Sequence, residues 1–446
     1  MFRSKLKPRL LAVPAEIKEM IFCSLPDLQT LQNVIETHPI FKETFENRPS
    51  YILTHVLSQT IPPAVFPEAY ASLRAVRVLD SIPRIGSRRR IPSEEQIKPV
   101  LDDYFQDKEI RCFKHKITFQ DAIQIEGFFQ KVHALTISFI ETAFSSAILS
   151  KKRSKSHIRP ISTAEFCRFY TAFYRFDLYC LLLASDRNKQ DFNMDWELFL
   201  SHFAPWEIEQ IGCVHDFLWS QINEPFKDVA SHDIEWGDFY IEWLDDEPSD
   251  YLSGICNWKL NFLASGIEFL HSLIGAKTYK ERWMLLNSRR KSRLNFLHEA
   301  LNLTQHPSRA LLARKYNMEF INCYSERPCS VDRDRGPYKT WKTAYALSDG
   351  RHAMWFQLRA FRDAAYVMWD DARIERWDDG HGLGVFSSIP PLSNLSSIKA
   401  IEEQRQSFIR RDKLWMEGAR GWWSRDDESK VVYNNGSTIF SYFGPE

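Results

Sequence analysis

Two pairs of adjacent carboxylates in the C-terminal third of the chain have the residue types needed to bind a divalent cation. Asp370-Asp371 and Asp378-Asp379 are offset by eight residues, which places both pairs on roughly one face of a helix. Carboxylate oxygens are the ligands that Mg²⁺ uses in phosphate and diphosphate chemistry. However, Arg373 and Arg376 lie between the pairs and can neutralise them at a spacing of three residues. The pattern favours a solvated, charge-paired helix face, and we expect no metal site.

Other residues that could do chemistry lack the spacing that a reaction needs. Cys323 and Cys329, with His306 and His352 as the nearest histidines, do not supply four zinc ligands at usual intervals. The glycine-rich segment 380–384 follows a predicted helix rather than a strand, so it does not match a dinucleotide-binding turn. No phosphate-binding loop, zinc-protease motif or nucleophile elbow is present. We predict a non-catalytic protein without cofactors, while a helical enzyme with distant Cys and His partners stays open.

Composition narrows the class of protein further. The 446 residues include 58 basic and 58 acidic side chains, so there is no general attraction to nucleic acid. Hydrophobic residues make up 44% of the chain, but no apolar run approaches the roughly 20 residues of a membrane span. The eight cysteines form no C-x-x-C pair, which suits a reducing compartment, either cytoplasm or nucleus. Two basic clusters could be nuclear import signals, contacts for acidic partners or solvated loops: Arg84, Arg88, Arg89 and Arg90, and Lys151, Lys152, Arg153 and Lys155.

Helical periodicity dominates the chain and predicts a mostly α fold. Apolar residues recur at steps of three and four in segments 119–150, 163–184, 204–221, 252–273, 292–303, 355–377 and 397–418. Only the tail 431–440, with β-prone runs around Asn435-Gly436, predicts a small β-hairpin. The proline- and arginine-rich stretch 81–95 divides the chain into an N-terminal region, 1–80, and a large irregular helical domain, 96–446, which has a further loop near 327–340.

The stretch 10–45, LLAVPAEIKEMIFCSLPDLQTLQNVIETHPIFKETF, is divided by prolines into three short predicted helices. Pro14 suits a first helical turn, Asp27 is a favourable N-cap, and His38-Pro39 interrupts the second helix. The first helix has an apolar stripe of Ile17, Met20 and Ile21. A unit of this size buries too little apolar surface to be stable alone, so it must pack on the rest of the chain, on a partner, or on both.

The same stretch resembles an F-box. The matching residues are Leu10, Val13, Pro14, Glu16, Ile17, Met20, Ile21, Leu25, Asp27, Leu28, Leu31 and Val34. The longer N-terminal region is similar to the F-box-like start of large families of uncharacterised filamentous-fungal proteins. The resemblance implies binding to the Skp-type adaptor subunit of a cullin-type ubiquitin ligase, with apolar helix faces in a partner groove. The expected docking residues are Leu10, Pro14, Ile17, Ile21, Leu25, Leu28 and Leu31.

The resemblance has a departure that keeps a second function open. His38-Pro39-Ile40-Phe41 stands where F-boxes often have a Cys-x-x-Trp-type pattern. The first expectation is a substrate-recognition adaptor whose helical domain holds an unknown protein substrate. The alternative is a helical interaction or scaffold protein with a degenerate F-box and no role in ubiquitin transfer. An exposed apolar face on the first helices favours the adaptor, and its complete burial against residues 119–220 favours the scaffold. Trp422-Trp423 is the aromatic pair expected at the surface.

Overall fold

The computed structural model describes residues 9–83, 92–110, 115–150, 160–183, 198–238, 257–288, 332, 334–347, 359–377, 386 and 398–433. These residues confirm a mostly α fold, with one small two-stranded sheet. The α-helices are α1 (Ala15–Cys23), α2 (Leu28–Thr37), α3 (Pro39–Asn47), α4 (Pro49–Leu57), α5 (Phe66–Ser81), α6 (Glu94–Ile110), α7 (Phe119–Ser145), α8 (Thr163–Leu182), α10 (Pro205–His232), α11 (Asn257–Leu263), α12 (Ile267–Gly275), α13 (Tyr279–Asn287), α17 (Gly336–Leu347), α18 (Arg359–Asp363), α19 (Asp371–Trp377) and α20 (Ile398–Met416).

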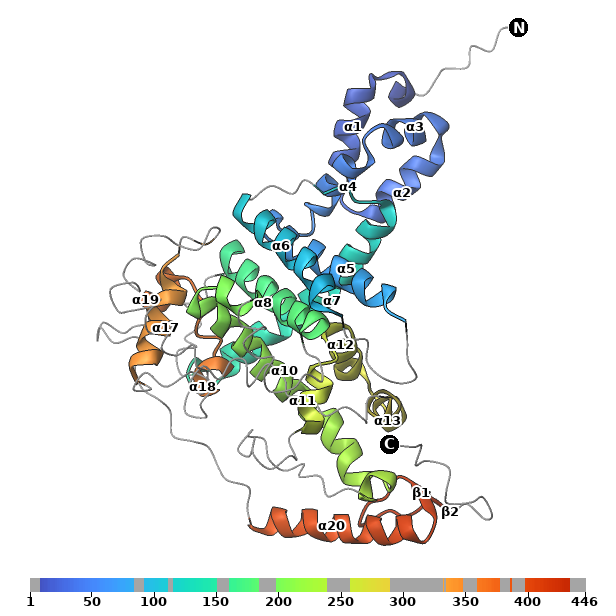
Figure 1. Ribbon diagram of the computed structural model, residues 1–446, viewed down its shortest axis with the longest axis vertical. Helices are drawn as coiled ribbons and strands as arrows, with labels where there is room; N and C mark the ends of the chain where they lie inside the picture. The colour runs from blue at the N-terminus through green and yellow to red at the C-terminus, as the bar shows by residue number, and fades with distance from the viewer. Residues whose placement is uncertain are drawn as a thin grey trace.

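Helices α1 to α4 form a lobe that projects at one end of the longest axis of the molecule (Figure 1). The predicted punctuation of its first three helices is confirmed. Asp27 accepts a hydrogen bond from the Thr30 amide at 2.7 Å, and His38 ends α2 and caps α3 before Pro39. Pro14 differs by one residue from the prediction, since it is the N-cap of α1 rather than part of its first turn. Short-range signals therefore set where α2 and α3 begin.

Helix α4 connects the lobe to the rest of the molecule. Its apolar residues Ile52, Leu53, Val56 and Leu57 are fully buried, and α4 packs against both α1 and α7. After it, α5 packs on α6 and α8, which follow the predicted linker 81–95 in the sequence. In the part of the chain that the structure describes, the two sides of this linker share one continuous hydrophobic core. The lobe is thus α1–α4, and α5 belongs to the body.

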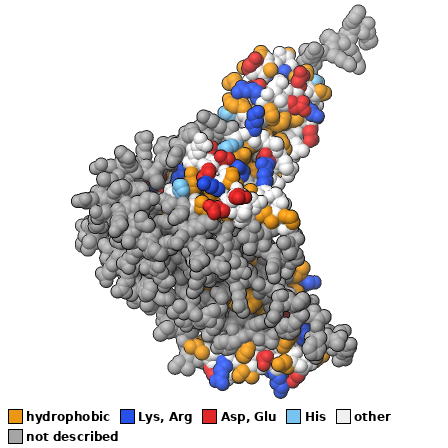
Figure 2. All heavy atoms as spheres, viewed as in Figure 1, with side chains coloured by type: hydrophobic (Ala, Val, Ile, Leu, Met, Phe, Trp, Pro, Cys, Tyr) orange, Lys and Arg blue, Asp and Glu red, His pale blue; other side chains and the backbone are white. Residues whose placement is uncertain are grey.

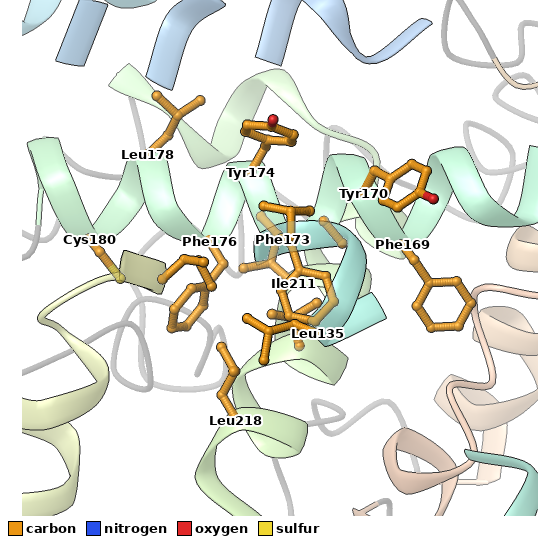
Figure 3. Packing of buried hydrophobic residues seen from close by; sticks show 14 of the residues in the cluster. Leu135, Phe169, Tyr170, Phe173, Tyr174, Phe176, Leu178, Cys180, Ile211 and Leu218 are labelled. Carbon is orange, nitrogen blue, oxygen red and sulfur yellow. The ribbon is translucent and has the colours of Figure 1, made fainter. Parts of the chain in front are cut away.

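Helix α8 is the centre of the body. Its start has a capping box, with Ser162 and Glu165 each bonded to the other's backbone amide. Figure 3 shows Phe173 and Phe176 directed toward Ile211 of α10 and Leu135 of α7, while Tyr174 and Leu178 lie on the opposite side of α8. Because α5 packs on α8 as well as α7 and α10, almost every side of α8 is buried. This explains its aromatic residues at nearly every turn.

The predicted helix 252–273 is broken in two by Gly266. Its first residues lie outside the described part of the chain, and the rest forms α11 and α12. Gly266 has φ of 83°, a conformation that side chains rarely adopt. The buried carboxylate of Asp177 on α8 then accepts a hydrogen bond from the Ile267 amide at 2.8 Å, at the N-terminus of α12. A tertiary cap from α8 therefore decides where α12 begins.

The prediction of a single helix over 355–377 is wrong. Residues 359–377 form two short helices, α18 and α19, separated by a buried turn. In this turn Ala365 has φ of 51°, and the Trp369 indole N–H donates to the carbonyl oxygen of Ala364 at 2.8 Å. The side chains from Ala364 to Trp369 are all fully buried. The stabilisation gained by burying both sides of this segment thus outweighs the stabilisation that a continuous helix would give.

The C-terminal end has the small antiparallel hairpin expected there. Strand β2 (Val431–Tyr433) is antiparallel to β1 (Ala419–Gly421), so its partner precedes it, and the expected turn at Asn435-Gly436 lies outside the described residues. Trp423, expected at the surface, is buried beside Ile234 and Leu414 in a second small core. Trp422 is half-buried and stacks on His232, with ring centroids 4.8 Å apart. The tryptophan pair expected at the surface instead lies where the chain after α20 packs on the end of α10.

Candidate functional site

An apolar surface on the outer side of the lobe is the strongest candidate site. Pro14 and Leu10 are exposed, and Ile17 and Met20 on α1 are 43% and 65% exposed. Ile21 is half-buried at the edge of the same stripe. We call these five residues the α1 face. Hydrophobic side chains lie among charged ones over this lobe (Figure 2). Large apolar side chains kept in water on one helix and the turn before it indicate a surface for binding another protein.

The opposite side of α1 holds the helix in place. Phe22 is buried, and its ring packs edge to face on Phe41 of α3, with centroids 6.0 Å apart. Lys18 is also buried on this side, and Leu25 is half-buried against the core. Because one side of α1 is anchored by Phe22, the α1 face is presented on a fixed scaffold.

The seven predicted docking residues divide into two groups. Leu10, Pro14, Ile17 and, in part, Ile21 belong to the α1 face. Leu25 is half-buried, whereas Leu28 and Leu31 on α2 are 2% and 0% exposed in the hydrophobic core. The docking role predicted for Leu28 and Leu31 is therefore corrected, because a side chain without accessible surface cannot contact a partner. The α2 apolar stripe serves the protein itself.

Two exposed residues near this surface were not among the predicted docking residues. Met20 is the most exposed apolar residue of α1, and its place in the Ile17–Ile21 stripe was the signal that could have identified it. Tyr51 on α4 is 43% exposed, and the guanidinium of Arg48 lies 4.2 Å from its ring centroid. Arg48 also pairs with Glu19 of α1 at 3.3 Å. No sequence pattern places Tyr51 beside the first helix.

The adjacent carboxylates Asp370 and Asp371 have partners far away in the chain. Asp370 pairs with Arg168 of α8 at 2.8 Å, and Asp371 accepts from Lys339 of α17 at 2.7 Å. Arg373 is buried and donates to Glu165 at 2.6 Å. The predicted solvated face is therefore wrong for these residues: they join α19 to α8 and α17. Asp378-Asp379, the segment 380–384, both basic clusters, and the Cys323, Cys329, His306 and His352 set lie outside the described residues.

A buried charge cluster joins α10 to α18. Arg362 donates to Glu209 at 2.6 Å and to Asp216 at 3.2 Å, and its guanidinium lies against Gly212, where a Cβ atom would be 3.0 Å away. Burial alone would raise the pKa of Asp216, but Arg362 and His215 hold it well below its usual range. For Glu209, burial outweighs Arg362 and raises the pKa. Such a cluster fixes two helices in register, because each charge satisfies another away from water.

The described residues contain no group of three or more His, Cys, Asp or Glu side chains arranged to hold a metal ion. Among the helices described, none combines the length and the apolar character that crossing a bilayer requires. The α1 face is the candidate site among the described residues, and its side chains are apolar.

Comparison with known proteins gives no relative, since no family model, no curated protein and no solved structure matches the chain.

Proposed function

We propose that the protein is an F-box-like substrate-recognition adaptor of a cullin-type ubiquitin ligase. The α1 face would bind the Skp-type adaptor subunit, and the helical body would hold a protein substrate. The observation that carries this proposal is the exposure of Leu10, Pro14, Ile17 and Met20 on and just before helix α1, which Phe22 anchors from its other side. Leu10, Pro14 and Ile17 are three of the seven docking residues that the F-box resemblance implies.

The proposed activity needs no bond chemistry in this chain. Two protein partners held on one rigid body meet at a raised effective concentration, which speeds transfer between them. The buried ion pairs of Arg362 with Glu209 and of Arg373 with Glu165 suit this role, because they fix the body of the molecule. Rigidity keeps the distance between two bound partners constant.

A specific observation supports the alternative of a helical scaffold without a ubiquitin role. Leu28 and Leu31, two of the residues that match the F-box pattern, are buried in the protein's own core. The surface left for an adaptor is therefore that of one helix and the turn before it. A lobe of this kind could bind some other helical protein through the same α1 face.

Co-purification with a Skp-type adaptor tests the proposal directly. The informative variant is Ile17→Asp with Met20→Asp, since both side chains are exposed and their replacement leaves the core of the lobe unchanged. We expect the wild type to retain the adaptor and the variant to lose at least about tenfold in affinity, because charge is placed in an apolar contact.

The matched control is Met284→Asp on α13, where the methionine is 57% exposed on a different element. It should bind the adaptor as the wild type does. Failure of the wild type to retain the adaptor sinks the ligase proposal and leaves the scaffold. Retention by the Ile17→Asp, Met20→Asp variant removes the α1 face as the docking surface.

A further inference from the structure

Helix α20 carries a second set of exposed apolar side chains, at the end of the molecule opposite the lobe (Figure 1). Ile401, Ile409 and Met416 on this helix are 51%, 53% and 72% exposed. With Arg405 and Asp412 they follow steps of four, four, three and four, so all five lie within an arc of about 80° at 100° per residue. We call them the α20 face.

The opposite side of α20 is fixed to the body. Arg411 is fully buried and donates to the backbone carbonyl oxygen of Asp233 at 2.7 Å, and the Ser407 hydroxyl donates to the Ser231 carbonyl oxygen at 3.1 Å. Leu414 belongs to the second small core. The α20 face therefore points away from the surface that holds the helix. Its three apolar side chains are exposed to solvent.

The order of residues on the α20 face indicates what binds it. From N- to C-terminus the face alternates apolar and charged: Ile401, Arg405, Ile409, Asp412, Met416. Read from C- to N-terminus, as an antiparallel copy presents it, the order is apolar, acidic, apolar, basic, apolar. A second α20 laid antiparallel about a two-fold axis beside Ile409 would set Ile401 against Met416 and Arg405 against Asp412, twice by symmetry. A parallel copy would instead set like charges together, which is unfavourable.

We propose that α20 is a self-association surface that joins two copies of this chain as an antiparallel helix pair. The alternation of opposite charges argues against a membrane surface as the occupant, since an anionic bilayer attracts faces of uniformly basic character. A 19-residue helix is about 28 Å long, which gives an interface at the small end of the specific range. The dimer is accordingly weak, with a dissociation constant on the order of 10 μM.

Sedimentation equilibrium of the full chain over a concentration series tests this proposal. The wild type should shift from monomer to dimer, and Ile409→Asp should remain monomeric at concentrations at least about tenfold higher. Met284→Asp, with a similarly exposed methionine on α13, should dimerise as the wild type does. A wild type that stays monomeric up to about 100 μM, ten times the expected constant, overturns the proposal.

Charge exchange tests the antiparallel order itself. Arg405→Asp alone and Asp412→Arg alone each place like charges in contact and should weaken the dimer about tenfold. The double variant restores opposite charges and should return to within about threefold of the wild type. A double variant no tighter than either single variant overturns the antiparallel pairing. Adaptor binding by the α1 face should be unchanged in all these variants, so this proposal and the ligase proposal can fail separately.

Discussion

Helices α1 and α8 show how similar apolar spacing leads to opposite environments. Both have large apolar residues at steps of three and four. On α8, Phe173 and Tyr174 are both fully buried although they point in opposite directions, because α5 packs on one side and α7 and α10 on the other (Figure 3). On α1, Phe22 is buried, whereas Ile17 and Met20 remain in water. Periodicity identifies the residues that share a face, whereas the neighbours of the helix decide which face is covered.

The ion pairs of the lobe and of the body also differ in burial. Disrupting the buried pair of the body should have the largest effect on stability. Arg362→Met in the body leaves Glu209 and Asp216 buried without their cation, which should lower the free energy of unfolding by about 3–5 kcal/mol. Urea unfolding followed by circular dichroism measures this change. In the lobe, Arg48→Met removes a partly exposed pair with Glu19 and should cost at most about 1 kcal/mol. Equal losses in the two variants would contradict the contrast.

The interior of the lobe should respond to a cavity as the body does. Leu31 is fully buried, so Leu31→Ala should cost about 2–5 kcal/mol through lost burial and the space left behind. In this variant the backbone amides of α1 to α3 should exchange hydrogen faster than those of α8, because α8 lies outside the lobe. A loss below about 0.5 kcal/mol would show that Leu31 is not part of a packed core.

The stability of the α20 end of the body should depend on pH through the carboxyl group of Asp233. Burial raises the pKa of Asp233 to about 6; its carboxylate accepts hydrogen bonds from Tyr279 and from the Trp236 amide, and Glu235 and Arg411 also act on it. The folded protein thus binds this proton more tightly than the unfolded chain, so its contribution to stability falls as pH rises from about 4 to 6.

Comparison with Asp233→Asn isolates this group from the others that titrate. Between pH 4 and pH 6.5 the wild type should lose on the order of 2–3 kcal/mol more than the variant, measured by urea unfolding at each pH. Identical pH profiles for the two proteins would show that Asp233 titrates near its ordinary value when folded.

The smallest change in stability is expected for a substitution on the α1 face. Measuring it is the most direct test of whether this face is exposed. Ile17→Ala should change the free energy of unfolding by no more than about 0.5 kcal/mol, because 43% of the residue is already in water and its neighbours Pro14 and Met20 are exposed as well. Thermal melts of the wild type and the variant should coincide within about 2 °C. A loss near that of Leu31→Ala would mean that this face is packed against the protein itself.

Local signals in the sequence determined the beginnings of several helices. Asp27, His38-Pro39 and Ser162 with Glu165 act on amides only two or three residues away, so their effect is visible in the chain alone. The stripe of Ile17, Met20 and Ile21 was visible for the same reason, since a helix brings residues three and four apart onto one face.

Tertiary structure decided what depends on groups distant in the chain. The sequence could not show that α12 begins at a cap from Asp177, that Arg373 pairs with Glu165, or that Trp423 is buried beside Ile234. It also could not separate Leu31 from Ile17, because both fit one apolar motif. The packing of α2 against α3 and α4 buries the α2 stripe, whereas Ile17 and Met20 of the α1 stripe stay in solvent. Burial depends on neighbours that come together when the chain folds, and no local pattern encodes them.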